Sequence, residues 1–346
     1  MARKIKALVF TAPYEMETRE FDLPECGPDD VVVKTHYSMV STGTDSRVLA
    51  GKQDIRGDEP YYPVVPGYSI VGEIVEVGSA AKGWRVGDLV SGRNPAKPVE
   101  GIRTTWGGHA SYQVYPSTGY CQPILLPSGA EPLDYIAVEL AAISHRGAVA
   151  AAALPGETAV VIGQGIIGAT SAAWLAAAGA RVVVADMASN RLKRAAQWGV
   201  SAAFSAREPD IVERIQAFTA GGADIVVESS GSMAGIRMAG QLTKDRRISI
   251  DGGAIRWPRF VFQATYTEEY SVNPPKLFVG DGAIVLCPGD RTPEDRSAAV
   301  EAFRTGVFNP KAFVDHVLPI SEAQSAYEGL RLRPDDYFTV AFDWRT

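Results

Sequence analysis

The stretch that decides the fold is residues 159–186, AVVIGQGIIGATSAAWLAAAGARVVVAD. Residues 160–162 form a short, branched apolar run that predicts a buried strand, and Gly163, Gly165 and Gly168 follow at G-x-G-x-x-G spacing. In this pattern the first glycine permits a tight turn, the second lets the backbone approach a pyrophosphate, and the third lets the helix pack against the strand. The stretch therefore predicts a dinucleotide-binding βαβ unit.

The residues after the glycines complete this unit. A helix over 169–178 is followed by Gly179, by a strand over 181–185 and by Asp186, about twenty residues beyond the glycines. A carboxylate there can accept the hydroxyls of an adenosine ribose, and its charge disfavours the 2′-phosphate of NADP. We therefore expect NAD as the cofactor. The alternative is a glycine-rich turn that binds no nucleotide.

The residues expected to contact the cofactor lie in three segments of the chain. The glycine turn, the helix start and the acidic segment contribute Gly163, Gln164, Gly165, Ile166, Ile167, Gly168, Asp186, Met187 and Arg191. Ser229, Ser230 and Gly231 follow a strand over 224–228, at the end of a strand where doubly wound sheets bind their ligands. Arg191 either stacks on the adenine from the rim or is a solvated helix charge.

Length and composition exclude several classes of protein. The chain has 346 residues, 46% of them hydrophobic, and a net charge of −6 at pH 7, so it can form two soluble domains. Its acidic balance argues against a nucleic-acid partner. The start, MARKIKALVF, indicates a first strand and not a signal peptide, and no apolar stretch reaches transmembrane length. We expect a cytoplasmic protein with no membrane partner.

The cysteines do not indicate a metal or disulfide site. Cys26, Cys121 and Cys287 are widely separated and form no C-x-x-C pair. We expect each of them to be a small buried apolar side chain.

The pattern of predicted secondary structure changes along the chain. Residues 1–120 carry short β-type runs between Pro and Gly clusters, with no long helix: 6–11, 31–37, 70–77, 89–91 and 109–114. From about Leu133, helices near 134–153, 189–198 and 208–219 alternate with strands, including 224–228 and 247–251. Such alternation predicts a parallel, doubly wound sheet. A helix over 294–305 and a strand over 337–344, which must return to a sheet, complete the chain.

With this order of segments, the chain resembles the medium-chain dehydrogenase/reductase superfamily, which includes the zinc alcohol dehydrogenases and the quinone reductases. Besides the glycine fingerprint, the resemblance depends on GTD at 43–45, VPGYSIVGEIVEVGSAAKGWRVGDLV at 65–90, WGGHASY at 106–112 and FVDHVLPISEAQSAYEGLR at 313–331. It implies an α/β protein with a GroES-like, β-rich catalytic domain over 1–135 and 290–346. A Rossmann domain with a doubly wound parallel sheet over 136–289 is also implied, with the active site in the cleft.

The departures from the zinc pattern are informative. Where the zinc enzymes carry a Cys before the G-[ST]-D triplet, this chain has Thr42, and where they carry Gly-His-Glu it has Gly-Tyr-Ser at 67–69. Glu139 lies near the position of their third ligand, but one carboxylate cannot hold a zinc ion that takes three protein ligands. Residues 91–110 contain no cysteine for a structural zinc lobe. We therefore expect no metal and a zinc-independent member of the superfamily.

Without zinc, a side chain must take the hydroxyl proton of the substrate as hydride passes to nicotinamide. By the resemblance, Thr44 stands where zinc alcohol dehydrogenases relay this proton; otherwise it satisfies a loop amide. Tyr68 replaces a metal ligand and either reaches the substrate oxygen or fills the vacated space. Glu139 is a base or pairs with Arg146, and His145 is a base or a packed helix histidine.

Three further residues are candidates for contact with the substrate. Arg47 either binds an anionic or polyhydroxylated substrate or is a solvated surface charge, and Thr42 and Trp106 are the other two. Asp45 should brace the loop that carries the GTD triplet. The loops over 93–106 and 256–276 should shape the pocket.

Together these features predict an NAD-dependent alcohol dehydrogenase that oxidises a polar secondary alcohol to a ketone, the alcohol being a sugar, cyclitol or polyol-like biosynthetic intermediate. The segments 38–51 and 62–78 resemble those of sorbitol-dehydrogenase-like and bacteriochlorophyllide-dehydrogenase-like members. Two alternatives stay open: an NAD(P)H-dependent reductase of an activated C=C bond, of the quinone or enoyl reductase type, and a non-catalytic NAD-binding relative. Relatives often form dimers by joining sheet edges, and the apolar residues 283–286 are a candidate edge for a homo-oligomer, either a dimer or a tetramer.

Overall fold

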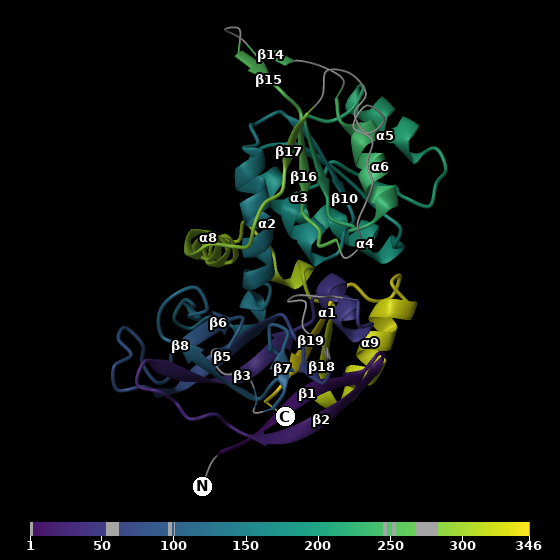
Figure 1. Cartoon of the computed structure of the whole chain (residues 1–346). Helices are drawn as coiled ribbons and strands as arrows, with labels where there is room; N and C mark the ends of the chain where they lie inside the picture. The colour runs from purple at the N-terminus through teal and green to yellow at the C-terminus, as the bar shows by residue number, and fades with distance from the viewer. Residues whose placement is uncertain are drawn as a thin grey trace. The chain divides into compact units, whose positions relative to one another are not determined.

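The computed structural model describes residues 3–52, 62–95, 99, 101–244, 248–250, 254–266 and 283–345. Contacts within the chain divide it into two compact units, each coloured along the chain in Figure 1. Unit 1 comprises residues 1–140, 292–306 and 313–346, and unit 2 comprises residues 141–291 and 307–312. No helix of the described residues is both long enough and apolar enough to span a membrane.

Unit 2 is built on a parallel sheet with the strand order β12-β11-β10-β13-β16-β17 (Figure 1). Its strands are β10 (Thr158–Ile162), β11 (Arg181–Asp186), β12 (Ala202–Ser205), β13 (Ile225–Glu228), β16 (Arg259–Phe262) and β17 (Ile284–Leu286). Every neighbouring pair is parallel. All residues of β10 are buried, as in a central strand covered on both faces. The doubly wound Rossmann sheet expected from the fingerprint is confirmed.

Helices lie on both sides of this sheet. They are α2 (Val138–Ala151), α3 (Ile166–Ala177), α4 (Ser189–Arg194), α5 (Ile211–Thr219) and α6 (Met233–Leu242), with a 3₁₀ turn at η2 (Ala195–Trp198). The helices α5 and α6 pack Ile211, Ile215 and Ile236 against Val160 and Val226 of the sheet. Figure 1 shows α2 on the opposite side of the sheet from α6. Burial of these aliphatic side chains fixes the strand ends that carry the glycine turn.

For one predicted strand of this region, the expected pairing was wrong. Residues 248–250 form β14 (Ile248–Ile250), which pairs antiparallel with β15 (Ala254–Arg256) in a separate two-stranded sheet. The parallel sheet continues instead with β16. A short run of branched apolar residues occurs both in hairpins and in parallel sheets, so the sequence pattern alone did not distinguish the two pairings. Residues 247 and 251, and the loop 256–276 from residue 267 onward, lie outside the described residues.

Unit 1 is rich in β-structure. Its larger sheet has the order β18-β19-β3-β5-β6-β9, with β8 also paired to β3, and a second sheet has the order β2-β1-β4-β7. The strands are β1 (Lys4–Ala12), β2 (Glu15–Asp22), β3 (Asp30–Met39), β4 (Val64–Val65), β5 (Ser69–Val77), β6 (Leu89–Gly92), β7 (Arg103–Thr104), β8 (Tyr112–Pro116), β9 (Ile124–Leu125), β18 (His316–Pro319) and β19 (Val340–Asp343). Since β19 pairs with both β18 and β3, the expected return of the chain end to a sheet is confirmed.

The helices of unit 1 are short. They are α1 (Thr42–Leu49), α8 (Pro293–Arg304) and α9 (Ala323–Leu332), and 3₁₀ turns lie at η1 (Pro132–Tyr135) and η4 (Ile320–Glu322); a further 3₁₀ turn, η3 (Pro310–Ala312), belongs to unit 2. The GTD triplet, expected in a loop, lies in α1. The expected burial of the cysteines is wrong: Cys287 is exposed, and Cys26 and Cys121 are only half-buried.

Candidate functional site

The glycine turn of unit 2 requires glycine at two positions for reasons internal to the protein. Gly163 has φ +86°, and a Cβ there would lie 2.7 Å from the amide nitrogen of Ser230. A Cβ at Gly168 would lie 1.8 Å from the carbonyl oxygen of Gly163. Gly165 differs, because its φ is −65° and no described atom lies within 4 Å of a Cβ placed there. The open space at Gly165 therefore suits the close approach of a bound group.

The start of α3 offers amide groups beside this space. Gly165 is the N-cap and provides no side-chain hydrogen bond, and the amide of Ala169 donates to the Gly165 carbonyl. The amides of Ile166, Ile167 and Gly168 thus have no acceptor within the helix. Such amides, together with the positive end of the helix dipole, attract phosphate. These residues fit the pyrophosphate of a dinucleotide.

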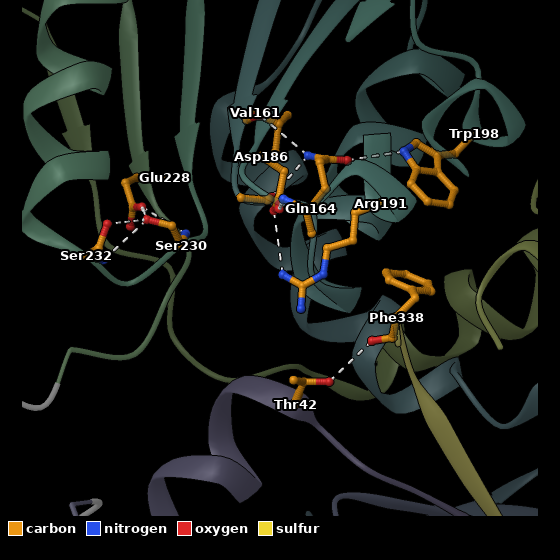
Figure 2. Close-up of polar contacts among 12 residues, drawn as sticks. Thr42, Val161, Gln164, Asp186, Arg191, Trp198, Glu228, Ser230, Ser232 and Phe338 are labelled. Carbon is orange, nitrogen blue, oxygen red and sulfur yellow. Dashed lines mark hydrogen bonds and ion pairs between the residues drawn. The ribbon is translucent and has the colours of Figure 1, made fainter. Parts of the chain in front are cut away.

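Gln164 holds the turn from the inside. Its side chain is completely buried, donates from Nε2 to the Gly163 carbonyl at 3.0 Å, and accepts at Oε1 from the Trp198 indole at 3.3 Å (Figure 2). Its backbone amide donates to Asp186 at 2.6 Å. Gln164 therefore shapes the site through its fixed backbone, and its side chain is engaged inside the protein with Gly163 and Trp198.

Asp186 ends β11 in a well-defined arrangement. Its Oδ2 accepts from the Gln164 amide, and its Oδ1 accepts from the Ala188 amide at 2.7 Å. Arg191 lies beside it, with Nη1 3.6 Å from Oδ2, and these side chains are only 7% and 17% exposed (Figure 2). Arg191 is thus neither an isolated solvated charge nor remote from the acid. Because a cation balances part of the carboxylate charge, charge alone excludes a 2′-phosphate less strongly than the sequence suggested. Met187, the next residue, is exposed.

The end of β13 carries a buried acid that sequence reasoning did not assign to the site. Glu228 accepts from the amides of Ser230 and Gly231 at 2.8 and 3.2 Å, and from the hydroxyls of Ser230 and Tyr266. Ser230 and Gly231 are therefore hydrogen-bonded to Glu228, and Figure 2 shows Ser230 beside this acid. The buried hydroxyl of Ser229 has no hydrogen-bond partner among the described residues. Of the three residues predicted here, Ser229 retains an unused polar group.

In unit 1, Asp45 braces the start of α1 as expected. It is buried, and its carboxylate accepts from the amides of Ser41 at 2.8 Å and Gly67 at 3.2 Å. Burial raises the pKa of Asp45 to about 7. These two bonds fix α1, which carries Thr44, against the segment that carries Tyr68.

The other candidates on α1 are half-buried. Thr42 donates from its hydroxyl to the Phe338 carbonyl at 3.4 Å (Figure 2), and Arg47 lies in the last turn. No side-chain hydrogen bond joins the Thr44 hydroxyl to the described residues, so the alternative role, in which it satisfies a loop amide, has no support here. Its hydroxyl stays available to a substrate.

Tyr68 belongs to a cluster that includes an arginine missed by sequence reasoning. Its ring stacks on Trp106, with ring centres 5.8 Å apart and an interplanar angle of 28°. Arg93, only 1% exposed, donates from Nη1 to the Tyr68 hydroxyl at 2.5 Å. The indole nitrogen of Trp106 is buried without a hydrogen-bond partner in the described part of the chain. The available signal was a charged residue directly after the buried strand β6.

Glu139 and His145 both lie on α2, in different surroundings. Glu139 is fully buried and accepts from Arg296 of α8, at 2.7 Å from Nη2 and 3.0 Å from Nε. The structural partner expected from the sequence was Arg146, whereas the buried ion pair is made by a residue 157 positions away. His145 packs edge-on against Trp174 in unit 2, with ring centres 4.5 Å apart. These contacts favour structural roles for both residues.

Comparison with known proteins agrees with this architecture. The family profile described as alcohol dehydrogenase GroES-like domain matches residues 27–126, and the profile described as zinc-binding dehydrogenase matches residues 167–248. The L-threonine 3-dehydrogenase of Chelativorans sp. (strain BNC1) is 32% identical over 286 residues, which cover 76% of this chain and 82% of that protein. The chain belongs to the medium-chain dehydrogenase/reductase superfamily.

Other members of this superfamily are similar over almost the full length. The sorbitol dehydrogenase of Halalkalibacterium halodurans is 26% identical, with 94% of this chain and 96% of that protein covered. A solved alcohol dehydrogenase of E. coli CFT073, complexed with NADH, superposes with a TM-score of 0.81 at 18% identity over 98% and 99% of the two chains. A solved dehydrogenase of Sinorhizobium meliloti 1021, bound to NADP, gives 0.80 at 21% identity over 99% of each chain. The chain is thus an oxidoreductase with GroES-like and Rossmann-like domains.

Zinc is common in this superfamily, but the donor set of this chain does not fit it. Thr42 and Tyr68 offer an alcohol oxygen and a phenol oxygen where thiolate and imidazole are the preferred ligands. The Glu139 carboxylate already has a cationic partner in Arg296. Within the described ranges, no group of three or more His, Cys, Asp or Glu side chains is placed to hold a metal ion.

Proposed function

We propose that the protein is a zinc-independent, NAD-dependent alcohol dehydrogenase that oxidises a polar secondary alcohol such as a sugar, cyclitol or polyol. One observation carries this proposal: of the residues that the sequence resemblance matches to zinc ligands, Thr42 and Tyr68 carry only hydroxyls, and Glu139 is already paired with Arg296. The same chain keeps the glycine turn and Asp186. A similar sorbitol dehydrogenase supports the polyol class of substrate.

Unit 2 supplies the groups that bind the cofactor. The amides of residues 166–168 take the pyrophosphate, and Asp186 accepts from the adenosine ribose. Ser229 donates its unused hydroxyl on the nicotinamide side, and the exposed Met187 provides apolar contact for the adenine. Arg191 covers the ribose end from the rim. When bound, NAD⁺ accepts a hydride from the carbinol carbon of the substrate.

Unit 1 supplies the groups that handle the proton and the substrate. Tyr68 takes the proton of the reacting hydroxyl, and Thr44 relays it. Thr42, Arg47 and the unpartnered indole of Trp106 hydrogen-bond to the other hydroxyls of a polyol. Glu139 and His145 are assigned to structure, because each is already engaged in packing or an ion pair.

Three measurements on the purified protein test the proposal. Metal analysis should find no stoichiometric zinc. Fluorescence titration should show tighter binding of NADH than of NADPH; the reverse order would favour a reductase of C=C bonds. A panel of sugars, cyclitols and polyols with NAD⁺ should produce NADH absorbance, and Tyr68→Phe should lower kcat by roughly 10²-fold or more. Full turnover in both Tyr68→Phe and Thr44→Val would refute the proton assignment.

We further propose that the protein is a homo-oligomer assembled through β17. Among the described residues this strand ends the parallel sheet, and its side chains Ile284 and Val285 are 45% and 47% exposed. An exposed apolar edge strand has unused backbone donors and acceptors that a second copy can pair.

A further inference from the structure

The cluster around Tyr68 contains a buried cation whose role the proposed function leaves open. Arg93 carries five donors and no acceptor, so at 2.5 Å its Nη1 donates and the Tyr68 oxygen accepts. This contact uses a lone pair of the phenol oxygen and leaves the phenol proton to another bond. Arg93 can therefore hold Tyr68 in place while Tyr68 exchanges its proton with a substrate.

The position of Arg93 is fixed by aromatic side chains. Its guanidinium carbon lies 4.9 Å from the centre of the Tyr68 ring and 5.8 Å from that of Trp106, and Nη2 donates to the Tyr120 hydroxyl at 3.3 Å. A guanidinium held over aromatic faces is attracted to them. Burial lowers the effective dielectric around the contact, so the cation acts strongly on the phenol oxygen.

We propose that Arg93 is a positioning residue that orients the Tyr68 hydroxyl and stabilises the oxygen after its proton leaves. The proposal rests on the proposed function and identifies what replaces the charge of the metal. In the oxidation, the substrate O–H bond breaks and its proton passes to deprotonated Tyr68, while the carbinol C–H bond breaks and its hydride passes to NAD⁺. A ketone and NADH result, and Tyr68 passes the proton through Thr44 to water.

The test compares kinetic constants of variants with the best alcohol of the panel. Arg93→Met should lower kcat by about 10²-fold with KM changed by less than about threefold, and Arg93→Lys should recover about tenfold of that loss. Arg93→Gln serves if Arg93→Met does not fold, and it should lose about thirtyfold in kcat. Arg345→Met is the matched control, because Arg345 also lies over a tyrosine, 4.4 Å from the Tyr37 ring centre, and it should behave as wild type.

A double variant separates positioning from mere structural support. If Arg93 acts through Tyr68, then Tyr68→Phe/Arg93→Met should be no slower than Tyr68→Phe alone. Multiplicative losses in the double variant, or wild-type kcat in Arg93→Met or Arg93→Gln, would overturn the proposal.

A spectroscopic measurement decides the case in which wild type oxidises no alcohol and the proposed function fails. Tyrosinate absorbance is followed against pH in wild type, Arg93→Gln and Tyr68→Phe, the last identifying the Tyr68 transition by its loss. Removal of the cation should move that transition to higher pH by at least about one unit. An unchanged transition would show that Arg93 does not act on the Tyr68 oxygen.

Discussion

The buried pair between Glu139 and Arg296 allows a decisive test of whether Glu139 is a catalytic base or a structural anion. Both side chains are at most 5% exposed, and Arg296 also donates to the Gln122 carbonyl at 2.8 Å. Removing one partner of such a pair leaves an uncompensated buried charge and costs about 3–5 kcal/mol. The stability loss of Arg296→Met should lie at the upper end of this range, since this variant also removes the hydrogen bond to the Gln122 carbonyl.

The expected outcome is a loss of stability without a loss of chemistry. Glu139→Gln and Arg296→Met should each lower the unfolding temperature by roughly 10 °C. Adding Glu139→Gln to Arg296→Met should recover about 2–3 kcal/mol, because it neutralises the stranded carboxylate. Well below the transition, Glu139→Gln should keep kcat within about threefold of wild type.

Calorimetry and steady-state kinetics on the same preparations provide the readouts. The matched control is Glu301→Gln, which breaks the exposed pair with Arg304 and should leave the unfolding temperature unchanged. The reasoning is refuted if Glu139→Gln loses 10²-fold or more in kcat while its unfolding temperature stays at the wild-type value, the signature of a general base.

Three further predictions follow from other parts of the structure. Asp186→Ser should release Arg191 to pair with a 2′-phosphate, so fluorescence titration should show tighter NADPH binding and weaker NADH binding. Replacing Arg191 by Met in this variant should abolish the gain in NADPH binding. An unchanged preference between the two cofactors would contradict the assignment of Asp186 to the ribose. Burial lowers the pKa of His109 from 6.5 to about 3, so the unfolded state binds the proton first as the pH falls, and the free energy of unfolding decreases below pH 6.5. In urea unfolding, wild type should lose about 2 kcal/mol more than His109→Gln between about pH 7.5 and about pH 5. Equal losses in the two proteins would contradict this. Ile284→Lys should place a charge on the exposed β17 edge and reduce the mass found by sedimentation, whereas an unchanged assembly would place the interface elsewhere.

The fold was largely readable from sequence where periodicity and special residues coincide. The branched run of β10, the crowded glycines at 163 and 168, and the acid at 186 all report local constraints, and the structure places them as expected. Sequence reasoning failed where one hydrophobic pattern fits two structures. The short apolar run of β14 suited a strand of the parallel sheet, but it pairs with β15 in a hairpin. Sequence reasoning also missed β2 (Glu15–Asp22), because most of its residues are polar or charged and most are exposed.

The site was less predictable, because its important contacts join distant residues. The partner of Glu139 is 157 positions away, and Arg93, which follows β6, reaches Tyr68, which precedes β5. No local spacing reports such contacts. Arg191 shows the same limit at short range, since a helix charge five residues after Asp186 can point outward or fold back, and in the structure it folds back.

The strand β19 lies between β18 and β3, so a unit that begins in the first tenth of the chain is finished by its last residues (Figure 1). Its residues Val340 and Phe342 also enter the apolar cluster formed with Leu8 and Phe10. During synthesis, unit 2 leaves the ribosome while unit 1 still lacks this strand. The parallel sheet can therefore fold first, and in the β-rich unit residues 37–39 of β3 lack their partner on one edge until β19 has been synthesised, while β8 already pairs with residues 30–34.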